Sequence, residues 1–154
     1  QEPQLLFQYG LFLEQVGDSE QAMVQMQKVL ELDPQNPYAL NFVGYTWADN
    51  GVNLEQALEY IQQAVALRPE DGFIRDSLGW VYFRLGQIEK AVNELEAARG
   101  LEPDDPNIHE HLGDAYLRAR QRRQAVEAYK RALDLYEEEE KEQEVRRKLK
   151  AIQQ

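Results

Sequence analysis

The chain contains no cysteine. A cysteine nucleophile, a disulfide framework and a cysteine metal site are therefore excluded. The absence of cysteine does not indicate whether the protein occupies an oxidising or a reducing compartment. No apolar run approaches the roughly 18–20 residues that a helix needs to span a bilayer. The chain begins at Gln1 with neither an initiator Met nor an apolar signal stretch. We therefore interpret it as a fragment, from which any targeting segment and an unknown number of preceding repeats would be missing.

Motifs of enzyme chemistry are missing as well. There is no Gly-rich phosphate loop, no nucleophile elbow and no zinc-binding histidine pair. His109 and His111 are two residues apart and point to different sides of a helix, so they cannot chelate a metal as an i, i+4 pair would. Asp76, Glu110 and Asp114 are weak candidates for acid–base work without a closed pocket. We expect a non-catalytic protein without a metal or cofactor.

Basic residues are scarce in the first half of the chain. The formal net charge of the whole chain is −11. Residues 1–67 hold nine acids and one base, whereas residues 68–154 hold nineteen acids and sixteen bases. An acidic protein repels phosphate backbones, whose capture needs clustered Lys and Arg. Nucleic acid is not expected as a partner.

Small residues recur at spacings of 34 or 35 residues, which indicates an internal repeat. The tracks are Gly10, Gly44, Gly79, Gly113; Ala22, Ala57, Ala91, Ala125; Val29, Ala64, Ala98, Ala132; and Pro34, Pro69, Pro103. Within one repeat, Leu78, Tyr82 and Leu85 lie at i, i+4 and i+7, the spacing of a helix face. The strand-like stretch "WVYF" is therefore predicted to be helical.

The pattern predicts eight helices, at about 3–16, 19–32, 37–50, 53–67, 71–85, 87–101, 106–119 and 121–137, and a ninth that runs to about 152. Asn36 and Asp105 each precede a proline and are expected to cap the following helix. Asp18 and Asn53, each followed three residues later by Gln, resemble capping boxes. The eighth and ninth helices could be continuous, because no Pro or Gly separates them.

The pattern over residues 3–136 resembles the tetratricopeptide repeat (TPR). The family signature appears in the third repeat as Leu78-Gly79, Tyr82, Gly86, Ala91, Leu95, Ala98 and Pro103. The fourth repeat departs from it, because Arg120 replaces the turn glycine and Glu137 replaces the proline. The resemblance implies an all-α, right-handed solenoid of four repeats, 3–36, 37–71, 72–105 and 106–136, with a C-terminal capping helix or extension in 137–154.

In this family the first helix of each hairpin lines a concave groove that binds a peptide or protein segment. The resemblance implies that Trp80, Tyr45 and Tyr38 contact the ligand, because aromatic residues dominate binding hot spots. The acidic members predict an apolar ligand with basic flanks. For Phe42 and Phe83, burial against neighbouring helices is the alternative. The predicted peptide-binding residues are Phe7, Tyr38, Asn41, Phe42, Tyr45, Asp49, Phe73, Asp76, Trp80, Phe83, Glu110, His111 and Asp114.

The stretches "GYTWADNG" and "DSLGWVYFRLG" resemble the C-terminal repeats of bacterial envelope lipoproteins that deliver substrate to a carboxyl-terminal processing protease. This implies an adaptor with a periplasmic, outer-membrane-tethered parent; a cytoplasmic protein is the alternative. A chaperone adaptor that clamps a carboxylate is excluded, since its Lys, Asn and Arg positions hold Phe7, Leu11, Phe42, Phe73 and Ser77. A structural module that buries its groove or repeat ends against another copy remains the rival function.

Two further segments, the first helix and residues 118–123, are predicted to form contacts outside the groove or to remain solvated. The first helix presents Leu5, Leu6 and Phe12 without a preceding repeat to cover them all, so we expect a homo-oligomer through residues 1–30. "RARQRR", Arg118 to Arg123, stands where other repeats have a Gly turn. It is either a solvated loop that compensates the acidic surface or a docking point for an acidic partner or lipid headgroup.

Overall fold

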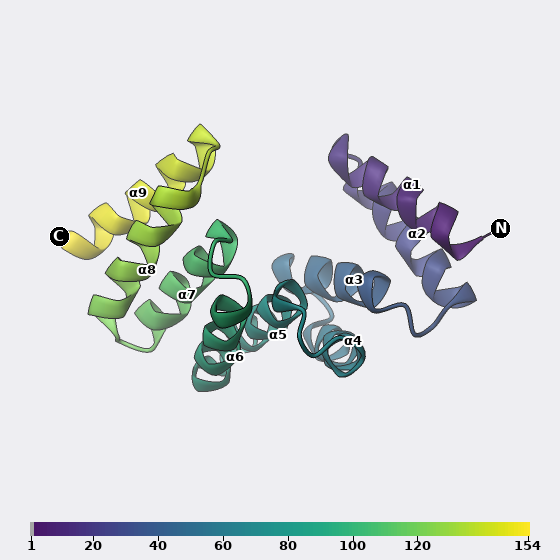
Figure 1. Cartoon of the computed structure of the whole chain (residues 1–154), viewed down its shortest axis with the longest axis horizontal. Coiled ribbons are helices and arrows are strands. Elements are labelled where there is room, and N and C mark those ends of the chain that lie inside the picture. Colours follow the sequence, from purple (N-terminus) through teal and green to yellow (C-terminus); the bar gives the residue numbers. More distant parts are fainter. Residues whose placement is uncertain (1) are drawn as a thin grey trace. The chain divides into compact units, whose positions relative to one another are not determined.

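The computed structural model describes residues 2–154, which form nine helices and no strand. The predicted all-α class is confirmed, and the predicted helix boundaries agree to within two residues. In chain order (Figure 1) the helices are α1 (Pro3–Gln15), α2 (Ser19–Leu32), α3 (Pro37–Asp49), α4 (Leu54–Leu67), α5 (Gly72–Arg84), α6 (Ile88–Leu101), α7 (Pro106–Arg118), α8 (Arg122–Leu135) and α9 (Glu139–Gln153).

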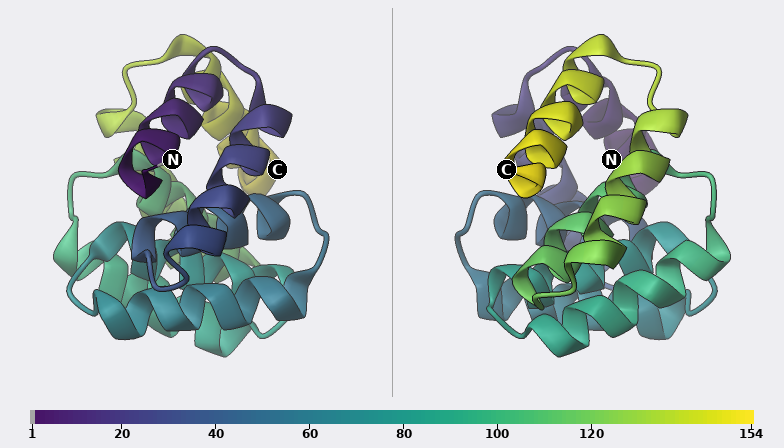
Figure 2. Two further views of the ribbon diagram at one scale, coloured as in Figure 1. Left: turned by 90° about the vertical axis from the view of Figure 1, so that its right-hand side faces the viewer. Right: turned by 90° about the vertical axis from the view of Figure 1, so that its left-hand side faces the viewer.

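The helices group into two compact units, which we call unit 1 (α1–α4, ending at Pro69) and unit 2 (α5–α9, beginning at Glu70). Each unit contains two hairpins, in which a first helix packs along the second: α1 on α2, α3 on α4, α5 on α6 and α7 on α8. Inside each unit the second helix of one hairpin also packs on the next helix, as α8 does on α9 in Figure 2. The first helices α1, α3, α5 and α7 therefore carry the predicted binding residues.

Side-chain caps explain where several helices begin. Asn36 Oδ1 accepts hydrogen bonds from the backbone N–H groups of Tyr38 and Ala39, and Asp105 accepts one from Ile108, so both predicted caps are confirmed. Asp18 accepts the N–H of Gln21 as predicted.

The capping box predicted at Asn53 is wrong. Its backbone is left-handed, with φ 48°, and its side chain makes no cap bond within the described chain. A cap that accepts such a bond normally has extended backbone instead. The residue that the second repeat has in addition lies next to it, at about Val52, and lengthens this loop.

Glycine allows the paired helices of unit 2 to approach closely. A Cβ at Gly79 would lie only 2.5 Å from Leu95 Cγ, and one at Gly113 would overlap the ring of Tyr129. The sequence pattern paired these glycines with the small residues Ala91 and Ala125. The closest neighbours are instead the large side chains one helical turn further on, so each glycine makes room for a core residue of the facing helix.

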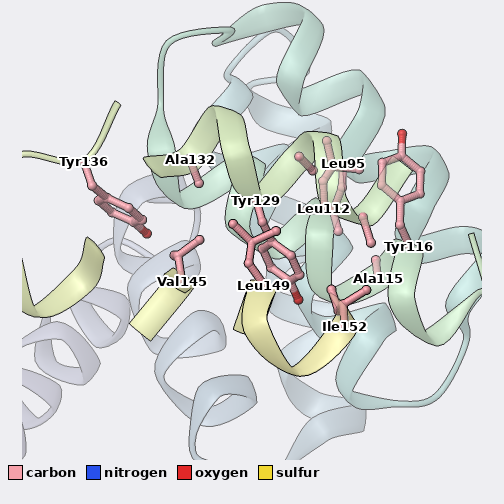
Figure 3. Packing of buried hydrophobic residues seen from close by; sticks show 12 residues of the cluster. Leu95, Leu112, Ala115, Tyr116, Tyr129, Ala132, Tyr136, Val145, Leu149 and Ile152 are labelled. Atoms are coloured by element: carbon pink, nitrogen blue, oxygen red, sulfur yellow. The ribbon is translucent and has the colours of Figure 1, made fainter. Parts of the chain in front are cut away.

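The core of unit 2 extends through α9 (Figure 3). Val145, Leu149 and Ile152, at the predicted helical spacing, pack with the fully buried Tyr129. Tyr136 has extended backbone (φ −68°, ψ 136°) and ends α8, which settles the open question: α8 and α9 are separate helices. Within the described chain, no helix is both long and apolar enough to cross a membrane.

We predict that Gly79→Leu and Gly113→Leu each destabilise the protein by about 1–3 kcal/mol or more, because the new side chain overpacks a filled interface. Gly100→Leu is the matched control: Gly100 is helical and exposed, and a Cβ there meets nothing within 4 Å. Thermal melts should separate the two buried sites from the control. Equal melting temperatures for all three variants would contradict this packing.

Candidate functional site

Unit 1 carries an open aromatic surface on its two first helices. Tyr38 is 45% exposed and Leu11 is 40% exposed, while Phe7 and Phe42 are half-buried against the core of the unit. The ring centroids of Phe7 and Tyr38 lie 6.4 Å apart, which brings α1 and α3 together on this surface. We call the surface formed by Phe7, Leu11, Tyr38, Phe42 and Tyr45 the α1/α3 aromatic face. All except Leu11 belong to the peptide-binding residues predicted from the sequence.

A polar group accompanies this face. Asn41, also predicted to bind a ligand, has a buried side-chain oxygen without a hydrogen-bond partner among the described residues. A buried acceptor of this kind costs free energy until a donor reaches it. Asp49 is exposed at the end of α3. The face therefore offers apolar contact area together with the negative charge of Asp49.

Trp80 does not have the exposure that the sequence suggested. Its side chain is 8% exposed, and its ring stacks between Phe83, at 4.8 Å, and His111, at 4.1 Å between centroids. The prediction of a solvent-facing groove Trp is wrong because α7 supplies the ring that covers it. Trp80 belongs to the packing of unit 2, where the loss of a large aromatic residue typically costs about 3–5 kcal/mol.

The other two predicted aromatic residues of α5 differ from one another. Phe83 takes the alternative role: it is half-buried and packs on the core of α6–α9. The Arg118 guanidinium carbon lies 5.3 Å from the centroid of its ring. Phe73 remains 51% exposed, so it stays available as a contact residue.

The predicted acidic residues of unit 2 are paired inside the chain. Asp76 accepts a hydrogen bond from His111 Nδ1 at 2.8 Å. Lys148 of α9 donates to Glu110 at 2.7 Å and to Asp114 at 3.0 Å. The expectation that these acids face a basic ligand is therefore wrong for the folded chain, because His111 of α7 engages Asp76 and Lys148 of α9 engages the other two. The sequence signal for this was the position of Lys148, three residues after the buried Val145 and next to Leu149.

Burial and ion pairing shift the pKa values of this cluster. Burial alone would lower the pKa of His111, but the carboxylates of Asp76, Asp114 and Glu110 raise it above 6.5. Burial would raise the pKa of Glu110, but Lys148 and the Tyr136 hydroxyl lower it below 4.5. Burial would likewise lower the pKa of Lys148, and the same carboxylates raise it. The cluster thus stabilises its charged forms.

The histidines serve packing rather than metal binding. His109 Nε2 lies 2.7 Å from the carbonyl oxygen of Pro103, which can only accept, so this nitrogen carries the proton and donates. His111 is engaged by Asp76 as described above. No group of three or more His, Asp or Glu residues in the part of the chain that the structure describes could hold a metal ion.

Comparisons with known proteins point to one family. Models described as tetratricopeptide repeats match residues 3–36 and 108–143, and one described as a TPR repeat matches residues 79–119. A TPR repeat-containing protein of Pseudomonas aeruginosa is 36% identical over 84 residues, which are 54% of this chain. The match spans only 14% of that relative's length.

Solved structures agree with the sequence matches. MamA from Desulfovibrio magneticus superposes with a TM-score of 0.71 at 28% identity, over 87% of this chain and 75% of its own. A variant of the O-GlcNAc transferase of Thermobaculum terrenum superposes with a TM-score of 0.73 at 27% identity, over 84% of this chain and 26% of its own. The similarity therefore covers most of the helical array of this chain.

We predict that the His111–Asp76 pair stabilises the fold below pH 6.5 and loses that contribution as the pH rises through the elevated pKa of His111. The free energy of unfolding of the native chain should exceed that of His111→Gln by more at about pH 6 than at about pH 9. Urea denaturation at both values measures this. Asp76→Asn should remove most of the pH dependence; a difference that is constant with pH would refute the assignment.

Proposed function

Because the chain belongs to the tetratricopeptide-repeat family, we propose that it is a non-catalytic protein-interaction scaffold whose α1/α3 aromatic face binds an apolar protein segment with basic flanks. The observation that carries this proposal is the exposure of Tyr38 and Leu11 beside the half-buried rings of Phe7 and Phe42. An exposed apolar patch of this kind typically marks an interaction surface.

The charge of unit 1 supports the choice of ligand. Residues 1–69 hold nine acids and two bases, a net charge of 2 − 9 = −7. One of the two bases, Arg68, has its guanidinium carbon 6.0 Å from the centroid of the Tyr38 ring. Basic flanks on the ligand would speed encounter with this unit, while the aromatic contacts supply most of the affinity.

The resemblance of "GYTWADNG" and "DSLGWVYFRLG" extends the proposal to a pathway. In a longer parent protein, tethered to the outer membrane and facing the periplasm, these repeats would serve as the adaptor of a carboxyl-terminal processing protease. The bound segment would then belong to a protease substrate or to the protease. This protease-adaptor role is supported by the two stretches alone. It is independent of the proposal that the α1/α3 aromatic face binds a ligand.

We expect Tyr38→Ala to weaken binding of a fluorescein-labelled peptide with a Leu/Phe centre and Lys flanks by about 2 kcal/mol, or about thirtyfold. Tyr9→Ala is the matched control, because Tyr9 lies on α1, is 50% exposed and faces away from Phe7 and Leu11. Fluorescence anisotropy gives both affinities. Equal losses in the two variants, or equal binding of a peptide with Glu flanks, would exclude this face as the site.

Self-association is a second candidate, favoured by the opposite side of α1. Leu5, Tyr9, Phe12 and Val16 lie at i, i+4, i+7 and i+11 and are 69%, 50%, 54% and 59% exposed. The residues one repeat later that correspond to the first two, Ala39 and Val43, are fully buried in the core shared with α2. This stripe therefore has the character of a helix–helix interface, and a second copy of the chain would cover it.

We predict concentration-dependent association of the chain through this stripe. Salt should strengthen the association, because unit 1 of each copy carries a net charge of −7 and salt screens the repulsion between the two copies. Phe12→Gln should shift the equilibrium to the monomer, while Tyr38→Ala should leave it unchanged. Light scattering across a protein dilution series measures the average mass. A strict monomer at about millimolar concentration, where even weak complexes form, would exclude self-association.

A further inference from the structure

Positive charge is concentrated at one end of unit 2. Residues 118–123 and 145–154 each contain four basic residues and no acid, so eight of the 17 basic residues of the chain occupy 16 positions. The Arg122 guanidinium donates to the carbonyl oxygen of Ile152, which ties the α7–α8 turn to the end of α9. The two segments therefore lie side by side, and we call them together the cationic end.

Half of these eight charges are available to a partner. Arg120, Arg146 and Lys150 are exposed. Arg123 lies 4.0 Å from Glu127, but both side chains are largely solvent-exposed, at 91% and 70%, and a pair of that kind contributes little. The other four are engaged within the chain: Lys148 by Glu110 and Asp114, Arg147 by Glu144, Arg122 by the Ile152 carbonyl and Arg118 by the Phe83 ring. The cationic end thus presents several uncommitted guanidinium and ammonium groups within an acidic protein.

The left-handed backbone of Arg120 lowers the stability of the turn relative to a turn with glycine. The corresponding turns of the first three repeats use Gly17, Gly51 and Gly86, with φ of 89°, 71° and 79°. Arg120 adopts the same left-handed conformation, with φ 63°. This conformation is strained for a residue with a Cβ and costs nothing comparable for glycine.

The hydrogen bonds of this turn are the same as in a repeat with glycine, so they do not compensate for the strain at Arg120. Gln121 N donates to Tyr116 O at 2.8 Å, as Gln87 N does to Tyr82 O at 2.9 Å in the third repeat. Since the turn forms equally well around glycine, the fold itself does not need the arginine. Strain that the fold does not require is typical of functional positions.

We propose that the cationic end is a second docking surface, which binds an acidic segment of a partner protein. Arginine suits this role because its planar guanidinium pairs with carboxylates through two parallel hydrogen bonds. A short acidic segment fits better than a membrane or a nucleic-acid duplex. The acidic first half of α9, which includes Glu139, Glu140 and Glu142, lies within about 9–14 Å of Lys148 along the helix and would repel an extended anionic surface.

The test uses the whole chain and a fluorescein-labelled peptide of alternating Glu and Gly residues, with the Gln/Gly peptide as the uncharged probe. Arg120→Gly should weaken binding of the Glu peptide about threefold, the loss of one exposed charge contact. The same substitution should raise the melting temperature by about 2–4 °C, because it relieves the backbone strain. A residue that matters only for the fold would not show opposite changes in affinity and stability.

Three further variants make the result specific. Arg120→Lys should keep the affinity within about twofold while leaving the melting temperature near that of the native chain, since the charge and the strain both remain. The triple variant Arg120→Gly, Arg146→Gln, Lys150→Gln should lose about tenfold or more. Arg84→Gln, an exposed arginine at the end of α5, is the control and should bind normally.

Three outcomes would overturn the proposal. One is unchanged affinity in the triple variant, and another is equal binding of the Gln/Gly peptide. The third is binding of phosphatidylserine vesicles or duplex DNA that exceeds binding of the Glu peptide and is lost in the triple variant. That last result would assign the cationic end to a membrane or to nucleic acid instead.

Discussion

The close approach of paired helices at the repeat glycines is the constraint on which the rest of this structure depends. Because Gly113 has no side chain, Tyr129 can lie against α7, and its hydroxyl donates a hydrogen bond to Asp114. Asp114 in turn accepts from Lys148 and so helps to fix α9. One missing Cβ thus connects the packing of a hairpin to the position of the C-terminal helix and to the charge that a ligand would meet.

Equivalent repeat positions have opposite uses in the two units. Leu11, Tyr45, Trp80 and Asp114 follow the glycines of successive repeats, yet Leu11 is 40% exposed while Trp80 is buried between two rings. In unit 2, His111 engages Trp80 and Asp76, and Lys148 engages Glu110 and Asp114, so these side chains are used within the unit. In unit 1 Leu11 and Tyr38 remain exposed, which is why we place ligand binding there.

The helices could be predicted from the sequence because hydrophobic periodicity and the glycine track report local geometry. Caps at Asn36 and Asp105 were predictable for the same reason, since each depends on two or three adjacent residues. The environment of Trp80 was not, because it depends on which side chain α7 contributes from 31 residues away along the sequence. The pairing of Glu110 and Asp114 depends on Lys148, more than 30 residues away in a helix outside the repeat pattern.

The central claim, that ligand binding belongs to unit 1, is tested most directly by chemical-shift mapping. The ¹⁵N-labelled chain would be titrated with the unlabelled Lys-flanked apolar peptide, and the amide shifts would be followed along the sequence. The account predicts that the largest changes cluster in α1 and α3, around Leu11, Tyr38 and Asn41, while α7 and α9 stay unperturbed. Changes centred on Trp80, His111 and Lys148 would contradict it, because they would show that the ligand opens the packed cluster of unit 2.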